Sequence, residues 1–349
     1  MDVISSNAPY YINVYATPDT PSEYKIYLGD SSAAVDLLYT GKIYIPEGSL
    51  SSYVAVDIQP VLVNYTPAEI GYPYYYGEYF LDGEPIYQKF TVTYPRSGGI
   101  STIKLYMIPC FENATNEELG WDSSTTAFPV KGNDYIQKKY INNTYFSALY
   151  MNPAGEGATS LVVKQYYPDD SSTTSTVEVL NGVIRNSGNL YLDSSTTSFD
   201  VIVDGTEVAK GIEVLHCVPE NTFILYYVNS FGGIDYIICD KKNSVTYNAD
   251  RHTMTQYANI TDRKNFSKRT YLNNTTRTWT LNTDYMTDEQ SKLMYKVFNS
   301  PYMWLYDVDK GQINSVILED KSLKIKQFRT DKFYNYTIKV TESQTFTLQ

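Results

Sequence analysis

Tyrosine is the residue that most constrains this chain, because it fills 36 of 349 positions and recurs in short runs of alternating apolar and polar side chains. Alternation with a period of two is typical of half-buried strands, and Tyr is favoured on their pleated surface. Residues 24–28 and 61–63 are read as such strands, and 90–94 and 102–108 flank a Ser-Gly-Gly turn at 97–99, as in a hairpin. The sequence therefore predicts a mainly β fold.

The length predicts about two domains, and the pattern divides the chain into three β-rich regions. Residues 1–111 are expected to form an N-terminal β-sandwich. Residues 112–215 are expected to form a β-meander or insertion region, and 216–349 a β domain with one short helix at 287–299. Three turn dipeptides separate strands of the middle region at hairpin spacing: Asn181-Gly182, Ser187-Gly188 and Asp204-Gly205.

One segment carries the signals of a helix. The Thr287 side chain can accept a hydrogen bond from the Gln290 amide while the Gln290 side chain reaches back, which is a capping box. Asp288 and Glu289 favour the positive end of the helix dipole, and Pro301 is expected to end the helix. Four apolar residues follow the cap at helical spacing and are expected to be buried against a sheet: Leu293, Met294, Val297 and Phe298.

The pentapeptide Asp-Ser-Ser-Thr-Thr occurs three times, beginning at Asp122, Asp170 and Asp193. Its intervals of 48 and 23 residues are unequal, so it is not a fixed-period repeat. Asp, Ser and Thr side chains bond to nearby backbone groups in turns. Exposed loop tips are therefore predicted for all three segments, and a divergent structural duplication is the alternative.

Histidine, the residue most common in catalytic and metal sites, is nearly missing. Only His216 and His252 are present, and no Gly-x-Ser-x-Gly, Walker-type phosphate loop or His-Glu-x-x-His occurs. No catalytic, cofactor-binding or metal site is therefore expected, and the chain is not expected to be an enzyme. Cys110, Cys217 and Cys239 are odd in number and widely spaced, so no disulfide framework is expected and they are interpreted as reduced, small core residues.

Two acidic patterns have plain interpretations. Residues 307–311, Asp-Val-Asp-Lys-Gly, resemble the start of a calcium loop but lack its later ligands, so a tight turn between two strands is predicted. A glycan hydrolase needs two carboxylates at a defined separation across a cleft. The adjacent pairs at 169–170 and 319–320 are interpreted instead as solvated loop residues.

The net charge of −11 is unevenly distributed. Residues 241–349 carry 17 Lys/Arg and 11 Asp/Glu, giving +6, whereas residues 1–240 carry 11 and 28, giving −17. Such asymmetry can drive docking between copies, although each sign can also simply solvate its own domain. The basic pairs at 241–242 and 263–264 are too short for a phosphate-binding face, so nucleic-acid contact is not expected. No membrane contact is expected either, because no apolar run approaches about 18 residues.

The densest group of tyrosines is the candidate interface: Tyr72, Tyr74, Tyr75, Tyr76 and Tyr79. A Tyr side chain offers a broad apolar ring with a hydrogen-bonding tip, and Tyr is enriched at protein interfaces for this reason. For most of the 36 tyrosines, covering half-buried sheet faces through cross-strand pairs is the favoured interpretation.

Three parts of the chain resemble a known class of proteins. They are residues 39–48 with 56–58, residues 217–235, and the strand 277–281 with the helix, Ser300-Pro301 and the strand around 336–338. These parts resemble virion and tail-module structural proteins of Bacteroides-infecting tailed phages, crAss-like phages among them. The middle part departs from that pattern at Ile234, because a Trp commonly follows the paired glycines there.

The resemblance implies a structural component of a tailed-phage virion, namely a homo-oligomeric building block of a ring, tail or baseplate. Its partners would be further copies of itself and other tail or neck proteins. It would be located in the tail or neck of the particle after assembly in the host cytoplasm. A receptor- or glycan-binding tail-fibre module, with residues 72–79 stacking on sugars, is the alternative, and a glycan-degrading enzyme is a third hypothesis that no residue pair favours.

Overall fold

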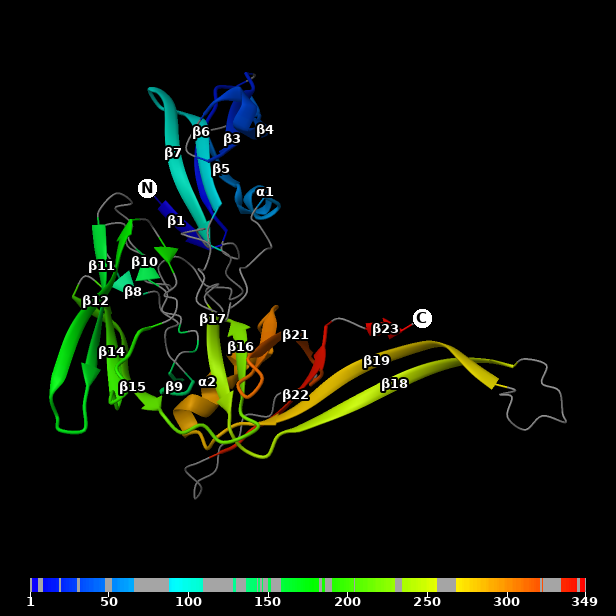
Figure 1. The fold of residues 1–349 in the computed structure, drawn as a ribbon. Helices are drawn as coiled ribbons and strands as arrows, with labels where there is room; N and C mark the ends of the chain where they lie inside the picture. Colours follow the sequence, from blue (N-terminus) through cyan, green and yellow to red (C-terminus); the bar gives the residue numbers. More distant parts are fainter. Residues whose placement is uncertain are drawn as a thin grey trace. The chain divides into compact units, whose positions relative to one another are not determined.

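The protein is described from a computed structural model, which is shown as a ribbon in Figure 1. Its described residues form several β-sheets and two α-helices, which confirms the prediction of a mainly β fold. Unit 1 comprises residues 1–216 and 228–235, and unit 2 comprises 217–227 and 236–349. The three predicted domain ranges stay predictions. The residues described are 2–5, 9–18, 20–29, 32–47, 52–65, 88–108, 128–129, 136–142, 144, 146, 150–151, 158–181, 184–185, 190–203, 205–229, 234–255, 268–320, 322, 334–343 and 346–348.

The described residues of the N-terminal part of unit 1 form seven strands and a short helix. They are β1 (Asp2–Ser5), β2 (Tyr11–Tyr15), β3 (Ser22–Leu28), the 3-10 turn η1 (Ala34–Asp36), β4 (Leu37–Ile43), β5 (Tyr53–Asp57), α1 (Gln59–Val63), β6 (Gln88–Arg96) and β7 (Gly99–Ile108). The strands β1-β7-β6-β3-β4 form one sheet in that order, and β2 pairs with β5 in a separate ladder. The hairpin predicted around residues 97–99 is confirmed: Arg96 pairs with Gly99, and Gly98 has a φ of +104°.

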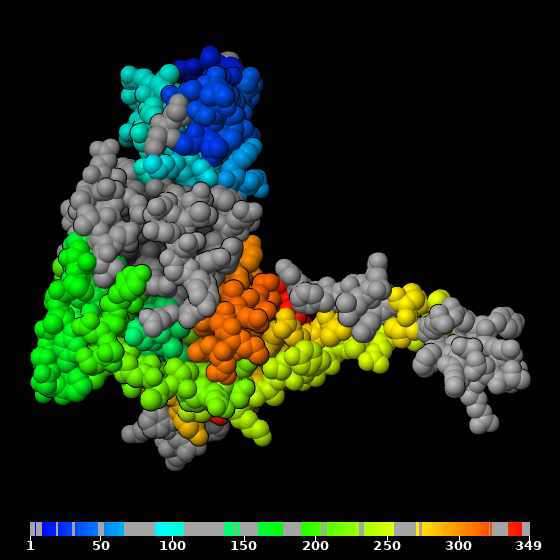
Figure 2. Space-filling view, in the orientation of Figure 1, coloured from blue at the N-terminus to red at the C-terminus, as the bar shows by residue number. Residues whose placement is uncertain are grey.

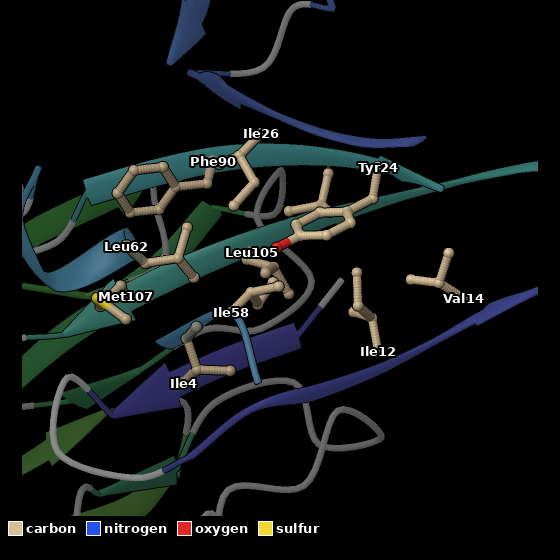
Figure 3. Packing of buried hydrophobic residues seen from close by; sticks show 11 residues of the cluster. Ile4, Ile12, Val14, Tyr24, Ile26, Ile58, Leu62, Phe90, Leu105 and Met107 are labelled. Atoms are coloured by element: carbon tan, nitrogen blue, oxygen red, sulfur yellow. The ribbon is translucent and has the colours of Figure 1, made fainter. Parts of the chain in front are cut away.

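Figure 3 shows the hydrophobic core of this part, which is filled from both the sheet and the ladder. Along β2 the side chains alternate, so that Ile12 and Val14 are buried while Tyr11 and Asn13 are exposed. Leu62 of α1 belongs to the same core cluster. The period of two read from the sequence therefore produces a layer with an apolar inner face and a Tyr-bearing outer face.

The predicted strand at 61–63 was wrong, because these residues belong to α1. Three apolar residues cannot distinguish a strand from one helical turn. Pro60 suits the first turn of a helix, where its missing amide hydrogen has no partner to lose. The Asp57 carboxylate also accepts hydrogen bonds from the backbone amides of Tyr10 and Gln59, at 3.0 and 3.1 Å, and so favours the turn into α1.

The rest of unit 1 contains β8 (Phe128–Pro129), β9 (Lys139–Ile141), β10 (Tyr150–Met151), β11 (Ala158–Tyr166), β12 (Ser172–Asn181), β13 (Ile184–Arg185), β14 (Ser198–Val203) and β15 (Thr206–Leu215). They form two sheets, with the orders β13-β10-β8 and β12-β11-β14-β15-β9. The rings of Tyr140, Phe146 and Phe199 pack edge to face, with centroid distances of 5.7, 5.4 and 5.3 Å. Burial raises the pKa of Tyr140, whose hydroxyl donates to the Thr144 carbonyl oxygen at 2.6 Å.

The prediction that the three Asp-Ser-Ser-Thr-Thr segments are exposed loop tips has a different result for each segment. The segment from Asp122 lies outside the described residues. The segment at 170–174 is exposed throughout, as predicted, although its last three residues already begin β12. It continues the β11–β12 turn, where Asp170 has a φ of +61°.

The third segment, from Asp193, is a turn with one buried residue. The Thr196 hydroxyl donates to the Gln165 side chain at 2.6 Å, so the prediction of full exposure was wrong there. The Tyr167 hydroxyl contacts Thr173 Oγ1 at 2.6 Å and donates to Asp193 at 2.5 Å. This tyrosine therefore joins the second and third segments, and the burial of Thr196 in the third depends on Gln165, a partner 31 residues away in the sequence.

Unit 2 is built on one large sheet and a helix. Its elements, with Val228, Ile234 and Asp235 counted in unit 1, are β16 (Phe223–Val228), β17 (Ile234–Cys239), β18 (Ser244–Thr255), β19 (Lys268–Asn282), α2 (Asp288–Phe298), β20 (Met303–Asp307), β21 (Gln312–Leu318), β22 (Thr337–Glu342) and β23 (Phe346–Leu348). The sheet order is β17-β16-β20-β21-β22-β19-β18, and β23 also pairs with β19. The predicted turn at 307–311 is confirmed between β20 and β21, with Gly311 at a φ of +62° and the Lys310 ammonium donating to Asp307 at 2.7 Å.

Helix α2 confirms the predicted capping box. Thr287 Oγ1 accepts from the Gln290 amide at 3.3 Å, and Gln290 Oε1 accepts from the Thr287 amide at 2.8 Å. Met294 and Val297 are fully buried, whereas Leu293 and Phe298 are half-buried, so the prediction of burial was wrong for those two. Leu293 lies about 100° around the helix from Met294, and Phe298 is the last helical residue.

The prediction that the three cysteines are core residues also has a different result for each of them. Cys239 is buried, as predicted, and burial raises the pKa of its thiol. Cys217 is exposed, so its prediction as a core residue was wrong. It lies in the connection between β15 and β16, where the chain has left both sheets. Cys110 lies outside the described residues.

Candidate protein-interaction surface

The strands β18 and β19 form a two-stranded ribbon that extends beyond the other strands of their sheet (Figure 1). We call residues 244–255 and 268–282 the arm. With 12 residues, β18 is about 40 Å long. Figure 2 shows the arm in yellow-green and yellow, extending from its base beside the orange residues away from the rest of its unit.

Among the described residues, additional strands lie beside β19 only between positions 273 and 282. β22 pairs with β19 at residues 278–282, and β23 pairs with it at 273–275. At residues 268–272, β18 is the one strand partner of β19 within the described part of the chain. A two-stranded ribbon is at best marginally stable in water, which makes the outer arm a candidate for contact with another molecule.

The arm has no buried face along β18. Every described side chain from residue 244 to 254 is exposed, and most of them are polar. Tyr247 is 67% exposed and Tyr271 is 54% exposed, and the Tyr271 ring lies 6.1 Å from the His252 ring. A strand that belongs to a core buries one of its faces, so β18 serves as surface and its aromatic rings offer contact area.

An ion pair fixes the base of the arm to the sheet. Arg277 Nε donates to one Glu342 oxygen at 2.9 Å, and Nη2 donates to the other oxygen and to Asn314 at 3.4 Å. The hydrogen bonds to Glu342 raise the pKa of the Arg277 guanidinium, which also lies 5.4 Å from the centre of the Trp279 ring. Glu342 and Trp279 are both buried, so the arm leaves the sheet from a well-packed base.

A second set of hydrogen bonds fixes the beginning of β18. The Asn243 side-chain amide donates to the carbonyl oxygens of Asn221 and Cys239, both at 2.8 Å. Its side-chain oxygen accepts from the Asn282 amide, also at 2.8 Å. The first residue before β18 and the last residue of β19 are thus tied together, and this positions both strands of the arm.

The arm and unit 1 carry opposite charge. The two strands of the arm hold four basic residues and one acidic residue: Arg251, Lys268, Arg269, Arg277 and Asp250. Unit 1 has 26 Asp/Glu and 11 Lys/Arg, which gives a net charge of −15. Opposite charges on two surfaces favour their encounter between molecules.

The candidate interface predicted from the sequence, Tyr72 through Tyr79, lies outside the described residues. Other tyrosines are exposed in the structure, among them Tyr11 and Tyr53 on the outer face of the β2–β5 ladder. Tyr226, Tyr227 and Tyr236 are buried in β16 and β17. These three are buried rather than half-buried, and the interpretation of most strand tyrosines as covers of half-buried sheet faces stays a prediction.

The described residues hold no group of three or more His, Cys, Asp and Glu side chains placed to bind a metal ion. No helix among them has both the length and the apolar character needed to cross a bilayer.

Sequence reasoning missed the arm, although a signal was present. Residues 244–255 and 268–282 are rich in Thr, Asn and Tyr, yet neither alternating face of β18 is consistently apolar. Strands without an apolar face cannot bury one, so this pattern is typical of an exposed ribbon. The chain matches no protein-family model, and no curated protein is significantly similar to it.

Proposed function

We propose that this chain is a structural component of a tailed-bacteriophage virion, a homo-oligomeric building block of a ring, tail or baseplate. The proposal draws on the resemblance of parts of residues 39–58 and 217–340 to virion and tail-module proteins of Bacteroides-infecting tailed phages. Its partners are further copies of itself and other tail or neck proteins. Its location is the tail or neck of the particle, assembled in the host cytoplasm.

The exposed arm is the observation that carries this proposal. In a lone molecule the arm presents an edge strand and exposed tyrosines to water, which invites association with other chains. In an assembly the same features supply contact area at each repeat of the structure. The hydrogen bonds of Arg277 and Asn243 fix the direction in which the arm leaves its sheet, so the arm would meet a neighbouring molecule in one orientation.

Electron microscopy tests the proposal directly. Gold-labelled antibodies against the purified chain should mark the tail or neck of intact particles, and mass spectrometry should find the chain in particles purified on a density gradient. Antibodies against a known capsid protein of the same particle provide the control for labelling. Intact particles that lack the chain would reject the proposal.

A receptor- or glycan-binding module is the second candidate, and one observation favours it. The rings of Tyr302 and Trp304 stack at 22° with centroids 6.5 Å apart, and Tyr302 is exposed. Aromatic faces of this kind can pack against the apolar side of a sugar ring. Two results would favour this candidate: the protein is a trimer rather than a ring, and it binds host surface polysaccharide in a way that Trp304→Ala abolishes.

A further inference from the structure

We propose that the arm of one copy docks on the acidic unit 1 of a second copy of this chain. The inference rests on the proposed function, because it names the contact through which copies would assemble. Three independent features of the arm lead to it: its unprotected edge, its exposed apolar side chains and its charge.

The first feature is the outer edge of β18, which pairs with no strand other than β19 in the described part of the chain. Soluble proteins usually protect a long edge strand with charged residues, prolines or bulges. Residues 244–249 contain none of these: the first charge is Asp250, and the register shift lies at His252/Thr253. Alternate residues of this stretch direct their backbone N–H and C=O groups away from β19, where a strand of another molecule can use them.

The second feature is the apolar area on the arm. Val245 and Tyr247 are two residues apart, so they share one face of β18, and both are exposed. Met254 and Tyr271 are exposed farther along the ribbon. Partly apolar side chains beside an open edge give a docking partner both backbone hydrogen bonds and contact area.

The third feature is charge, and it selects the partner. Arg251, Lys268 and Arg269 belong to the arm, whereas unit 1 has a net charge of −15. A second copy of the chain therefore supplies a surface of the complementary sign. Nucleic acid fits less well, because Arg277 is already bound to Glu342 and three remaining cations are fewer than the roughly 6–10 phosphate contacts of a strong duplex binder.

The first test reverses the charge of the arm in the full-length protein. Arg251→Glu/Lys268→Glu/Arg269→Glu should weaken self-association at least tenfold in sedimentation experiments at about 0.1 M salt, where screening is still moderate. The matched control, Lys242→Glu/Lys292→Glu/Lys339→Glu, makes the same charge change at exposed residues of unit 2 outside the arm. It should associate like the wild type, and circular dichroism should show that both variants are folded.

The second test removes contact area without changing charge. Tyr247→Ser should weaken self-association several-fold at low and high salt alike, whereas Tyr285→Ser, which removes a similarly exposed ring outside the arm, should not. Equal association of Tyr247→Ser and the wild type would overturn a role for this face of the arm.

The third test identifies the surface that receives the arm. Isotopically heavy and light copies are mixed, assembled and treated with a carbodiimide, which joins ammonium and carboxylate groups in direct contact. Heavy-to-light links from Lys268 to Asp or Glu residues of unit 1 are expected. Three results would each overturn the inference. Cross-links could reach only unit 2, the wild type could stay monomeric, or the arm variant could lose binding to duplex DNA but keep its self-association.

The proposed function can survive the failure of this inference. It stands if the chain is present in particles and the arm variant still assembles normally.

Discussion

At the scale of single residues, Gly41 and Arg277 are each required because of one neighbouring side chain. Gly41 lies in β4 against the ring of Tyr24, and a Cβ placed there would be 2.1 Å from that ring. Arg277 has its partner in Glu342, whose carboxylate is almost fully buried. Neither requirement is visible locally, because the partners are 17 and 65 residues away in the sequence.

Replacing Gly41 with Ala should destabilise the N-terminal part of unit 1 by about 1–3 kcal/mol, as overpacking does. Tyr24 is only 6% exposed, so its ring cannot move freely away from the added methyl group. Urea denaturation of the full chain measures the loss. Thr40→Ala, at an exposed neighbour in the same strand, should change stability by less than about 0.5 kcal/mol. Equal effects of the two substitutions would contradict the close approach.

Replacing Arg277 with Met should cost about 3 kcal/mol, because it leaves the buried Glu342 carboxylate without its partner. Thermal and urea unfolding should both show the loss. The double variant Arg277→Met/Glu342→Leu removes both charges and should recover most of the stability. If the double variant is as unstable as the single one, the unpaired charge is not the cause.

At the scale of elements, the same β pattern has two outcomes. β16 and β17 are buried along their whole length, whereas β18 is exposed wherever its side chains are described. Helix α2 shows the corresponding division on one element, with Met294 and Val297 buried and Leu293 half-buried. The contacts of an apolar residue with the rest of its unit, and not its helix or strand propensity, decide how much it contributes to stability.

The substitution Met294→Ala should therefore destabilise unit 2 by about 2–5 kcal/mol, because it removes a fully buried side chain and leaves a cavity. Leu293→Ala should cost clearly less, since that side chain already contacts water. Chemical denaturation followed by Trp fluorescence compares the two. A larger loss for Leu293→Ala would show that the helix presents a different face to its unit.

At the scale of the whole molecule, charge and contact area have separate roles. Residues 1–240 carry −17 and residues 241–349 carry +6. Exposed ion pairs are individually weak, about 0–1 kcal/mol, so tyrosine-rich contacts would supply most of the affinity. The charges would chiefly steer the encounter and select which surfaces meet.

Raising the salt concentration should therefore slow assembly more than it dissolves finished oligomers. Screening acts first on separated charges, because the Debye length is about 10 Å at 0.1 M salt. Light scattering at several ionic strengths measures the rate of assembly, and dilution of preformed oligomers measures their dissociation. Equal salt dependence of the two rates would contradict a steering role for the charges.

Local patterns alone were enough to predict several parts of this protein. The mainly β fold follows from period-2 runs, the hairpin at 97–99 from its glycines, and the cap of α2 from Thr287 and Gln290, which are three residues apart. In each case the residues that decide the structure are near neighbours in the chain, so their interactions form wherever the segment is placed.

Other features were decided by tertiary structure. Residues 61–63 became a helix beside a sheet, Thr196 was buried by its bond to Gln165, and Leu293 was left half-exposed. The arm was missed for the same reason, because the exposure of a strand depends on how far distant strands pair with it. Along β19, the pairing with β22 covers residues 278–282 and the pairing with β23 covers 273–275. Strand-forming residues determine that a strand forms, but burial is a property of its neighbours.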